Sequence, residues 1–298
     1  MNNNNDLLQK LAGDLALAPP GEKPKKAARL REITRLAGVS PASIHEFYAA
    51  ILRQEFPPMA VPAINIRGMT FDITCAAWRA AQKLQAEPII FELAPFMMVS
   101  VSQDFAEYCA IIEVAAVHEG YAGPVFLQED SFQLATEKDL LHIKQMIVSA
   151  VHAGMHNLDI NAPPWFNQAG KSHLERQKPK GRLIAQLTSF ALDNNPAGIH
   201  LFIGGEAGGL GRINKIIQDL QAFMKLFSEW FSNHNNGLDE VSAGTGTGLG
   251  GILGTGGWIS YMRDEIVSAL QNWFENMLVV LNVAEKKDYF LNYYLTRG

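Results

Sequence analysis

Apolar and polar positions follow two alternating patterns from about residue 40 onward. Short apolar runs bounded by Gly, Pro or polar residues are typical of buried strands. The longer segments between them repeat apolar residues every three or four positions, as helices with one buried face do. The pattern therefore predicts strands that alternate with helices. The expected strands span residues 61–66, 88–94, 124–130, 156–161, 198–206 and 238–244.

Helices are predicted in the segments that separate these strands, and one more precedes the first strand. In that first helix, Ser40 and Pro41 have the order of an N-cap and a first helical residue, and an apolar stripe begins at Ile44. Gly120 and Gly154 are placed to end two later helices in a left-handed conformation. The expected helices span residues 41–52, 72–84, 104–119, 136–154, 181–192, 214–231 and 259–274.

Strands and helices that alternate at this spacing predict an α/β fold with a parallel sheet, either doubly wound or closed as a barrel. Six units, or seven at most, exceed the size of a typical doubly wound domain and favour a TIM (β/α)8-barrel-like fold. An eight-stranded barrel would then be short at its C-terminus. Residues 1–57 are interpreted as an N-terminal helical extension and linker, and residues 58–298 as the barrel domain.

Composition and charge narrow the classes of function. The chain has 298 residues, 48% of them apolar and 18% charged, which is typical of a globular protein. Its formal net charge of −5 argues against general affinity for nucleic acid. No apolar stretch reaches the roughly 20 residues of a membrane helix, and no secretory signal is recognisable, so a cytoplasmic location is expected. Cys75 and Cys109 lie on apolar helix faces and are predicted to be small core residues.

A glycine-rich segment, "GTGTGLGGILGTGG", spans residues 244–257 and contains the spacing G-x-G-x-x-G. A dinucleotide site requires this motif in the first βα turn, at the start of a helix. Here it follows the sixth expected strand, and the next helical pattern begins near residue 259. A Walker-type loop would also need a Lys after its last glycine. The segment is therefore not predicted to bind a dinucleotide or ATP.

Polar residues gather at the C-terminal ends of the expected strands, where ligands bind in parallel α/β folds. Carboxylates that converge there are costly unless they meet a cation, a proton or a substrate hydroxyl. The alternative for each of them is solvation or helix capping in its own loop. These strand-end residues are Asn65, Glu92, Gln128, Glu129, Asp130, Asp159, Asn161, Gly204, Gly205, Glu206 and Thr245.

Seven short motifs occur in an order that resembles the class II, metal-dependent fructose- and tagatose-bisphosphate aldolases, in the branch with a GGE loop. The motifs are "PAIN", "PIIFELA", "GPVFLQEDSFQ", "NLDIN", "IGGEAGGLGRIN", "LQAFM" and "VSAGTGTGLGG", within residues 61–251. The resemblance implies a TIM barrel, a divalent metal that is usually zinc, and glycolytic aldol cleavage or condensation of ketose bisphosphates. In that chemistry the metal stabilises an enediolate as a Lewis acid.

The resemblance also implies roles for individual residues. Asp130 matches the catalytic acid/base, and Glu206 matches the loop carboxylate that transfers a proton at the enediolate. Asp159 matches the first acid of a pair on the fourth strand, and Asn161 stands in place of the second. The positions expected to contact substrate or phosphate are Asn65, Gly205, Thr245, Gly250 and Gly251.

Two departures from the family concern the metal. Ser131 and Leu249 occupy positions where those aldolases have metal-binding histidines, and neither side chain replaces imidazole as a zinc ligand. His200, with about 20 Å of strand between it and Glu206, is expected near the opposite end of the barrel. No metal ligand is therefore assigned, and whether the chain is an enzyme stays open. The alternative to an aldolase is a catalytically degenerate relative that binds a sugar phosphate or serves as a partner subunit. A homo-oligomer is expected in either case.

Overall fold

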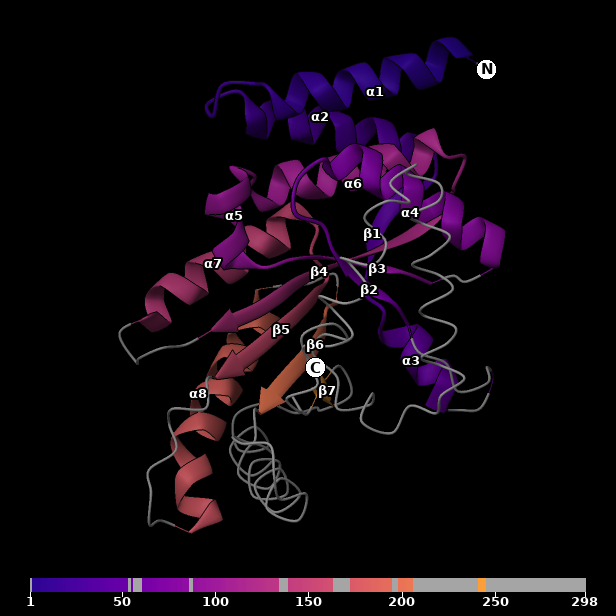
Figure 1. Cartoon of the computed structure of the whole chain (residues 1–298). Helices are drawn as coiled ribbons and strands as arrows, with labels where there is room; N and C mark the ends of the chain where they lie inside the picture. The colour runs from indigo at the N-terminus through magenta and orange to yellow at the C-terminus, as the bar shows by residue number, and fades with distance from the viewer. Residues whose placement is uncertain are drawn as a thin grey trace, which may run out of the picture.

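Parallel strands alternate with helices in the computed structural model, which describes residues 2–52, 55, 61–85, 88–133, 139–162, 172–194, 198–205 and 241–244 (Figure 1). The helices are α1 (Asn2–Ala16), α2 (Lys23–Leu36), α3 (His45–Leu52), α4 (Thr70–Leu84), α5 (Pro95–Val101), α6 (Phe105–His118), α7 (Leu140–Ala153) and α8 (His173–Asp193). The strands are β1 (Val39–Ala42), β2 (Ala63–Asn65), β3 (Ile90–Leu93), β4 (Gly123–Gln133), β5 (Asn157–Ala162), β6 (His200–Gly205) and β7 (Val241–Gly244).

The elements read from the hydrophobic pattern are largely confirmed. Each of the six expected strands overlaps an observed one, from β2 to β7. Four expected helices correspond to α4, α6, α7 and α8, and Gly120 and Gly154 have φ values of +78° and +99° after α6 and α7. The helices expected at residues 214–231 and 259–274 lie outside the described residues.

The start of the first expected helix was wrong. Ser40 and Pro41 lie in β1, which pairs in parallel with Gly123–Phe126 of β4, and α3 begins only at His45. Val39 is fully buried there, so pairing with β4 outweighs the local capping pattern. A Ser-Pro pair does not distinguish the two outcomes, because the fixed φ of proline suits both a helix start and a strand at a sheet margin.

The sheet is wound in one direction through the described strands. All pairings are parallel, and the strands lie in chain order from β2 to β7, with β1 added on β4. A doubly wound sheet would reverse its order at a switch point, and these strands do not. Helices that follow one another also pack side by side, α4 on α6, α6 on α7 and α7 on α8. The expected α/β fold with a parallel sheet is confirmed, and closure into a barrel stays a prediction.

Asn157 joins β1 to the start of β5. Its buried side-chain amide donates to the backbone carbonyls of Ala42 and Leu127 at 3.1 and 3.0 Å, and its carbonyl oxygen accepts from the backbone N–H of Ile44 at 2.9 Å. Strand β1 pairs with the first part of β4 and β5 with the later part. The two strands therefore follow one another along the same edge of β4, and Asn157 satisfies the backbone groups at the junction.

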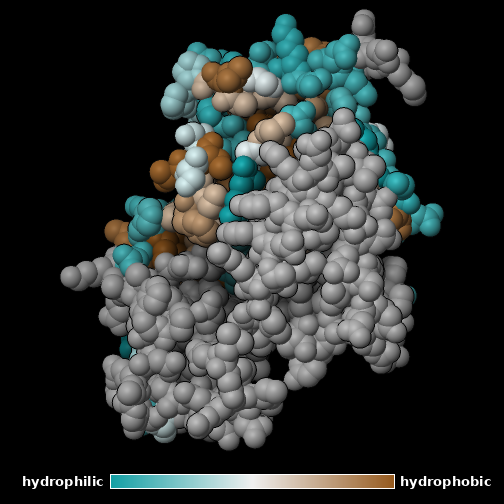
Figure 2. Space-filling view, in the orientation of Figure 1, coloured by the Kyte–Doolittle hydropathy of each residue, from teal (hydrophilic) through white to brown (hydrophobic). Residues whose placement is uncertain are grey.

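Helix α6 is buried on all sides, as its sequence "FAEYCAIIEVAAVH" predicts by having apolar residues around its whole circumference. One side packs on the sheet, and α1 and α2 cover the other (Figure 1). Figure 2 shows that the outward surface of this α1–α2 layer is mostly hydrophilic. The buried residues shared by α1, α2 and α6 are Ala12, Leu15, Ala27, Leu30, Ala110, Ile111 and Val114.

Two ion pairs fix α2 to α6. Lys23 pairs with Glu107, and Arg31 Nε lies 3.1 Å from Oε1 of Glu113, a side chain with only 1% exposure. Thr34 donates to the second Glu113 oxygen at 2.8 Å. Burial raises the pKa of Glu113, and Arg31 and Thr34 oppose that rise. The Glu113 carboxylate is therefore compensated mainly by groups on α2.

Replacing Arg31 with Ala should destabilise the protein by about 2–3 kcal/mol, because it leaves a buried carboxylate with one neutral donor. The matched control is Arg35→Ala, which breaks a pair between exposed Arg35 and exposed Glu32 on the same helix and should leave stability nearly unchanged. The measurement is the urea midpoint of unfolding at neutral pH. Equal losses in the two variants would show that the Arg31–Glu113 pair does not anchor the layer.

Candidate functional site

The two faces of the sheet carry different side chains. Phe91, Leu93 and Leu127 belong to the main apolar core, and the ring of Phe91 lies 5.5 Å from that of Trp78 on α4. Residues in register across parallel strands point to the same face. Asn65, Glu92 and Gln128 are in register on β2, β3 and β4, and they alternate with the core positions. A polar row therefore lies on the face turned away from the helices.

This row belongs to a polar group at the C-terminal ends of β2 and β3 and the adjoining middle parts of β4 and β5, which we call the carboxyl-edge cluster. Asn65 Nδ2 donates to Oδ2 of Asp130 at 2.7 Å, and Gln128 Nε2 donates to Oε1 of Glu92 at 2.7 Å. Asp159 on β5 is close enough to shift the pKa of Glu92. Glu92, Gln128 and Asp159 are each at most 3% exposed. The cluster consists of Asn65, Glu92, Gln128, Asp130 and Asp159.

The opposite end of the same face is apolar and is covered by α3. Ile44 and Ile90 are buried there with Phe47, Ala63 and Phe126 around them. An apolar layer therefore borders the carboxyl-edge cluster on the side toward the starts of the strands.

His200 begins β6 in register with Asn157, which pairs in turn with Gln128 on β4. Its ring lies 5.7 Å from that of His45 at the start of α3. Burial, with a smaller contribution from His45, lowers the pKa of His200 to about 3. His200 is therefore neutral at physiological pH and contributes no charge to the cluster.

A β-bulge shapes β4 at Asp130. Glu129 pairs with Leu158 and Phe132 with Ile160, so β4 has one more residue than β5 between these pairs. A bulge redirects side chains and often lies next to a functional site. Here it allows Phe132 to enter the apolar core while Asp130 contacts Asn65 on the polar face.

Burial and mutual repulsion raise the pKa values of the carboxyl groups around the cluster. The pKa of Glu92 is raised well above its ordinary value, mainly by burial and then by the charges of Asp130 and Asp159. Burial also raises the pKa of Asp130, although Asn65 and the nearby Arg67 oppose it. Glu129, on the helix-facing side, has a strongly raised pKa from burial and from Asp159 and Asp130. The raised pKa favours the protonated form of Glu92, which can donate a hydrogen bond.

The structure brings together three of the residues expected at the site, Asn65, Asp130 and Asp159. It places the backbone of Asn161 in register with Gly204, and Gly205 ends β6 beside them. The remaining expected site residues, together with the position of the missing histidine at Leu249, lie outside the described residues: Glu206, Thr245, Gly250 and Gly251.

Glu92 and Gln128 are the members that sequence reasoning did not assign to the site. Both were recognised as strand-end residues, but neither matched a motif role. The available signal for Glu92 is its place as the one charged residue of the apolar strand "PIIFELA". A buried strand seldom carries a carboxyl group without a compensating contact. The contact is Gln128, whose position depends on the register of β3 and β4.

The side chains at the described strand ends do not provide the kind of zinc site that the resemblance implies. Their side chains offer carboxyl and amide groups, and zinc sites of that type are built on histidines. Among the described residues, the only three His, Cys, Asp or Glu side chains whose ligand atoms lie within 4.8 Å of one another are Cys75, His118 and Glu119, which are not at the strand ends.

No protein-family model matches the chain, and no curated protein does. A crystal structure of a probable tagatose 6 phosphate kinase from Sinorhizobium meliloti 1021 is similar at 13% sequence identity, with a TM-score of 0.43. The match covers 74% of this chain and 62% of that one, so the chain spans less than two thirds of its length. In the described part of the chain, no helix is both long and apolar enough to cross a membrane.

These findings correct the expectation that the chain is a class II aldolase. No family model matches the chain, that of the class II aldolases included. The missing metal ligands also argue against aldolase chemistry. Ser131 and Leu249 replace the imidazole ligands on which the metal-stabilised enediolate depends. The predicted aldol cleavage of ketose bisphosphates was therefore wrong, and so were the roles predicted for Asp130 and Glu206 in that reaction.

The raised pKa of Glu92 predicts how stability depends on pH. The folded state binds a proton at Glu92 that the unfolded state releases above about pH 4.3, so this group makes stability fall as pH rises from there through the folded-state pKa. Glu92→Gln should remove this slope, so it should stabilise the protein relative to the wild type more at pH 8 than at pH 4.5.

The measurement is urea unfolding of both proteins at the two pH values. Asp14→Asn, an exposed acid on α1, is the control and should shift stability equally little at both. A difference between Glu92→Gln and the wild type that does not change with pH would contradict preferential protonation of Glu92.

Proposed function

We propose that this chain binds a small polyhydroxylated ligand of the sugar-phosphate class at the carboxyl-edge cluster, without a metal. The chain's own side chains would recognise the hydroxyl groups by hydrogen bonding. The proposal corresponds to the non-aldolase alternative reached from the sequence, in which the metal ligands are lost and the ligand site is retained.

The observation that carries the proposal is a pair of buried acceptors. Asn65 Oδ1 and Gln128 Oε1 are inaccessible to solvent and have no hydrogen-bond partner among the described residues. Their amide nitrogens already donate to Asp130 and Glu92, which fixes the direction of each amide. A buried acceptor without a donor costs about 1–3 kcal/mol. Hydroxyl groups of a sugar are donors that suit both oxygens.

The carboxyl groups complete a set that matches polyols. Carboxyl oxygens of Asp130 accept hydrogen bonds, and a protonated Glu92 can donate one, so adjacent positions offer both kinds of contact. Alternating donors and acceptors suit vicinal hydroxyls, each of which both donates and accepts. This set is a better match for a sugar than for an apolar ligand or a nucleobase.

A phosphate group is expected beside the cluster. Arg67 is exposed two residues after the end of β2 and lowers the pKa of Asp130, so its charge acts at this edge of the sheet. Strands β6 and β7 both end in glycine, at Gly205 and Gly244. Backbone N–H groups of glycine-rich loops recognise phosphate without a basic side chain. The expected phosphate contacts at Thr245, Gly250 and Gly251 belong to this proposal.

The proposal includes closure of the sheet into a barrel. Strands in chain order with helices packed side by side on one face leave the polar face to be enclosed by the sheet itself, as in a TIM barrel. Self-association of the closed barrel stays a prediction, to be measured by light scattering.

Calorimetric titration in the presence of a chelator tests the proposal. Fructose 1,6-bisphosphate or dihydroxyacetone phosphate should bind with one-to-one stoichiometry, and more tightly than free fructose or inorganic phosphate. Asn65→Ala should weaken binding about tenfold, which corresponds to the loss of one hydrogen bond of about 1.4 kcal/mol.

Asn194→Ala is the control, since Asn194 is exposed after α8 and should leave affinity unchanged. Two results would refute the proposal. One is the absence of saturable binding of either compound, and the other is binding that Asn65→Ala leaves intact.

A further inference from the structure

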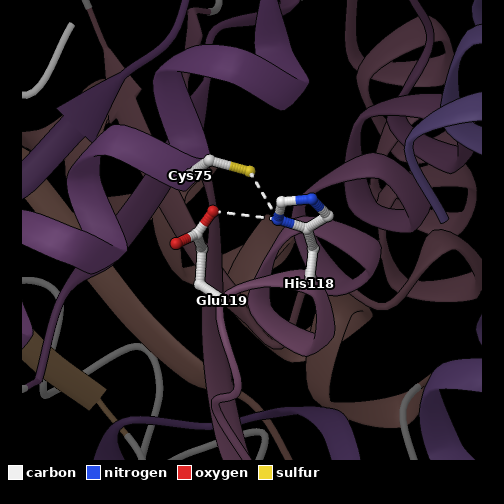
Figure 3. A group of neighbouring side chains, drawn as sticks. All are labelled: Cys75, His118 and Glu119. Atoms are coloured by element: carbon white, nitrogen blue, oxygen red, sulfur yellow. Dashed lines mark hydrogen bonds and ion pairs between the residues drawn. The ribbon is translucent and has the colours of Figure 1, made fainter. Parts of the chain in front are cut away.

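A second group of side chains lies on the helix layer, away from the carboxyl-edge cluster. Cys75 is on α4, His118 is the last residue of α6, and Glu119 follows it directly (Figure 3). Helix α6 runs back toward the start of β4, so the group lies at the end of the sheet where strands begin. It is therefore separate from the proposed sugar-phosphate site, and the inference below does not depend on that proposal.

The three side chains point toward one another. Cys75 Sγ lies 3.7 Å from Nδ1 of His118, and the same nitrogen lies 2.9 Å from Oε1 of Glu119. Figure 3 shows both contacts meeting at this one ring nitrogen. A nucleophilic Cys–His–acid triad uses the two ring nitrogens for its two partners. The arrangement is therefore not that of a catalytic triad. It places three possible metal ligands around one point.

We propose that Cys75, His118 and Glu119 bind a divalent transition metal, with zinc as the best match to a thiolate, an imidazole and a carboxylate. Tetrahedral zinc with usual bond lengths places S and N ligand atoms about 3.6 Å apart and N and O atoms about 3.4 Å apart. The Cys75–His118 separation already has this value within about 0.1 Å. The His118–Glu119 contact must open by about 0.5 Å when the metal replaces the proton between them.

Neighbouring side chains hold the proposed metal ligands in place. Arg79 donates two hydrogen bonds to the Glu119 carboxylate, at 2.7 and 2.8 Å, and the ring of Phe71 packs edge-on against His118 at 5.2 Å. Outer contacts of this kind orient metal ligands and adjust affinity. The His118 and Glu119 side chains are 18% and 10% exposed, which leaves a path for an ion and a fourth position for water or an external ligand.

Titration of the full chain with cobalt, a spectroscopic substitute for zinc, tests the proposal. One equivalent should produce the near-ultraviolet absorption of a thiolate–cobalt bond, and one equivalent of zinc should displace it. Cys75→Ala should abolish this absorption, and Cys109→Ala, which removes the other buried thiol, should preserve it. Circular dichroism of each metal-free variant establishes that it is folded.

Glu119→Gln provides a second variant that keeps the shape of the side chain and should weaken cobalt binding at least tenfold. Three results would overturn the proposal: no stoichiometric binding to the wild type, thiolate absorption that persists in folded Cys75→Ala, or unchanged affinity in Glu119→Gln. None of these measurements involves a sugar phosphate, so failure here and failure of the proposed function are distinguishable.

Discussion

Parallel pairing of neighbouring strands in chain order is the constraint on which the rest of this structure depends. Crossovers between parallel strands have one hand, so strands added in sequence place their helices on one face. Helices α4, α6, α7 and α8 accordingly form a contiguous layer. The helix-facing side of the sheet becomes the apolar core, and the other side is free to carry polar groups near the strand ends. The carboxyl-edge cluster exists because of this division.

Buried charge is handled differently in the two layers. Glu113 on α6 faces cations and hydroxyls of α2, so its cost is offset inside the protein. Glu92 faces an amide and other carboxyl groups, and its pKa rises instead. Glu92 keeps a proton, and acceptors beside it lack a hydrogen-bond donor. Such an arrangement costs stability and suits the binding of a ligand. The contrast is physical support for placing the binding function at the strand ends.

Sequence reasoning found part of the candidate site and misjudged its chemistry. The rule that ligands bind at strand ends selected all five members of the cluster, although motif roles were assigned only to Asn65, Asp130 and Asp159. Motif order suggested an aldolase, although the residues that bind its metal were absent. Motif order reports a succession of strand ends, which many α/β proteins share, whereas a reaction depends on individual ligands. Cys75 and His118 went unnoticed as a pair because 43 residues separate them.

The sequence by itself determined strands β2 to β7, four of the helices between them and the α/β class with a parallel sheet, because hydrophobic periodicity reflects local backbone geometry and one-sided burial. It also showed that Ser131 and Leu249 cannot hold zinc as the histidines of an aldolase do. Only the tertiary structure decided that Ser40 and Pro41 join the sheet, that Glu92 meets Gln128, and that Cys75 meets His118 and Glu119. These contacts depend on strand register and helix packing between distant segments, and local sequence carries little information about either.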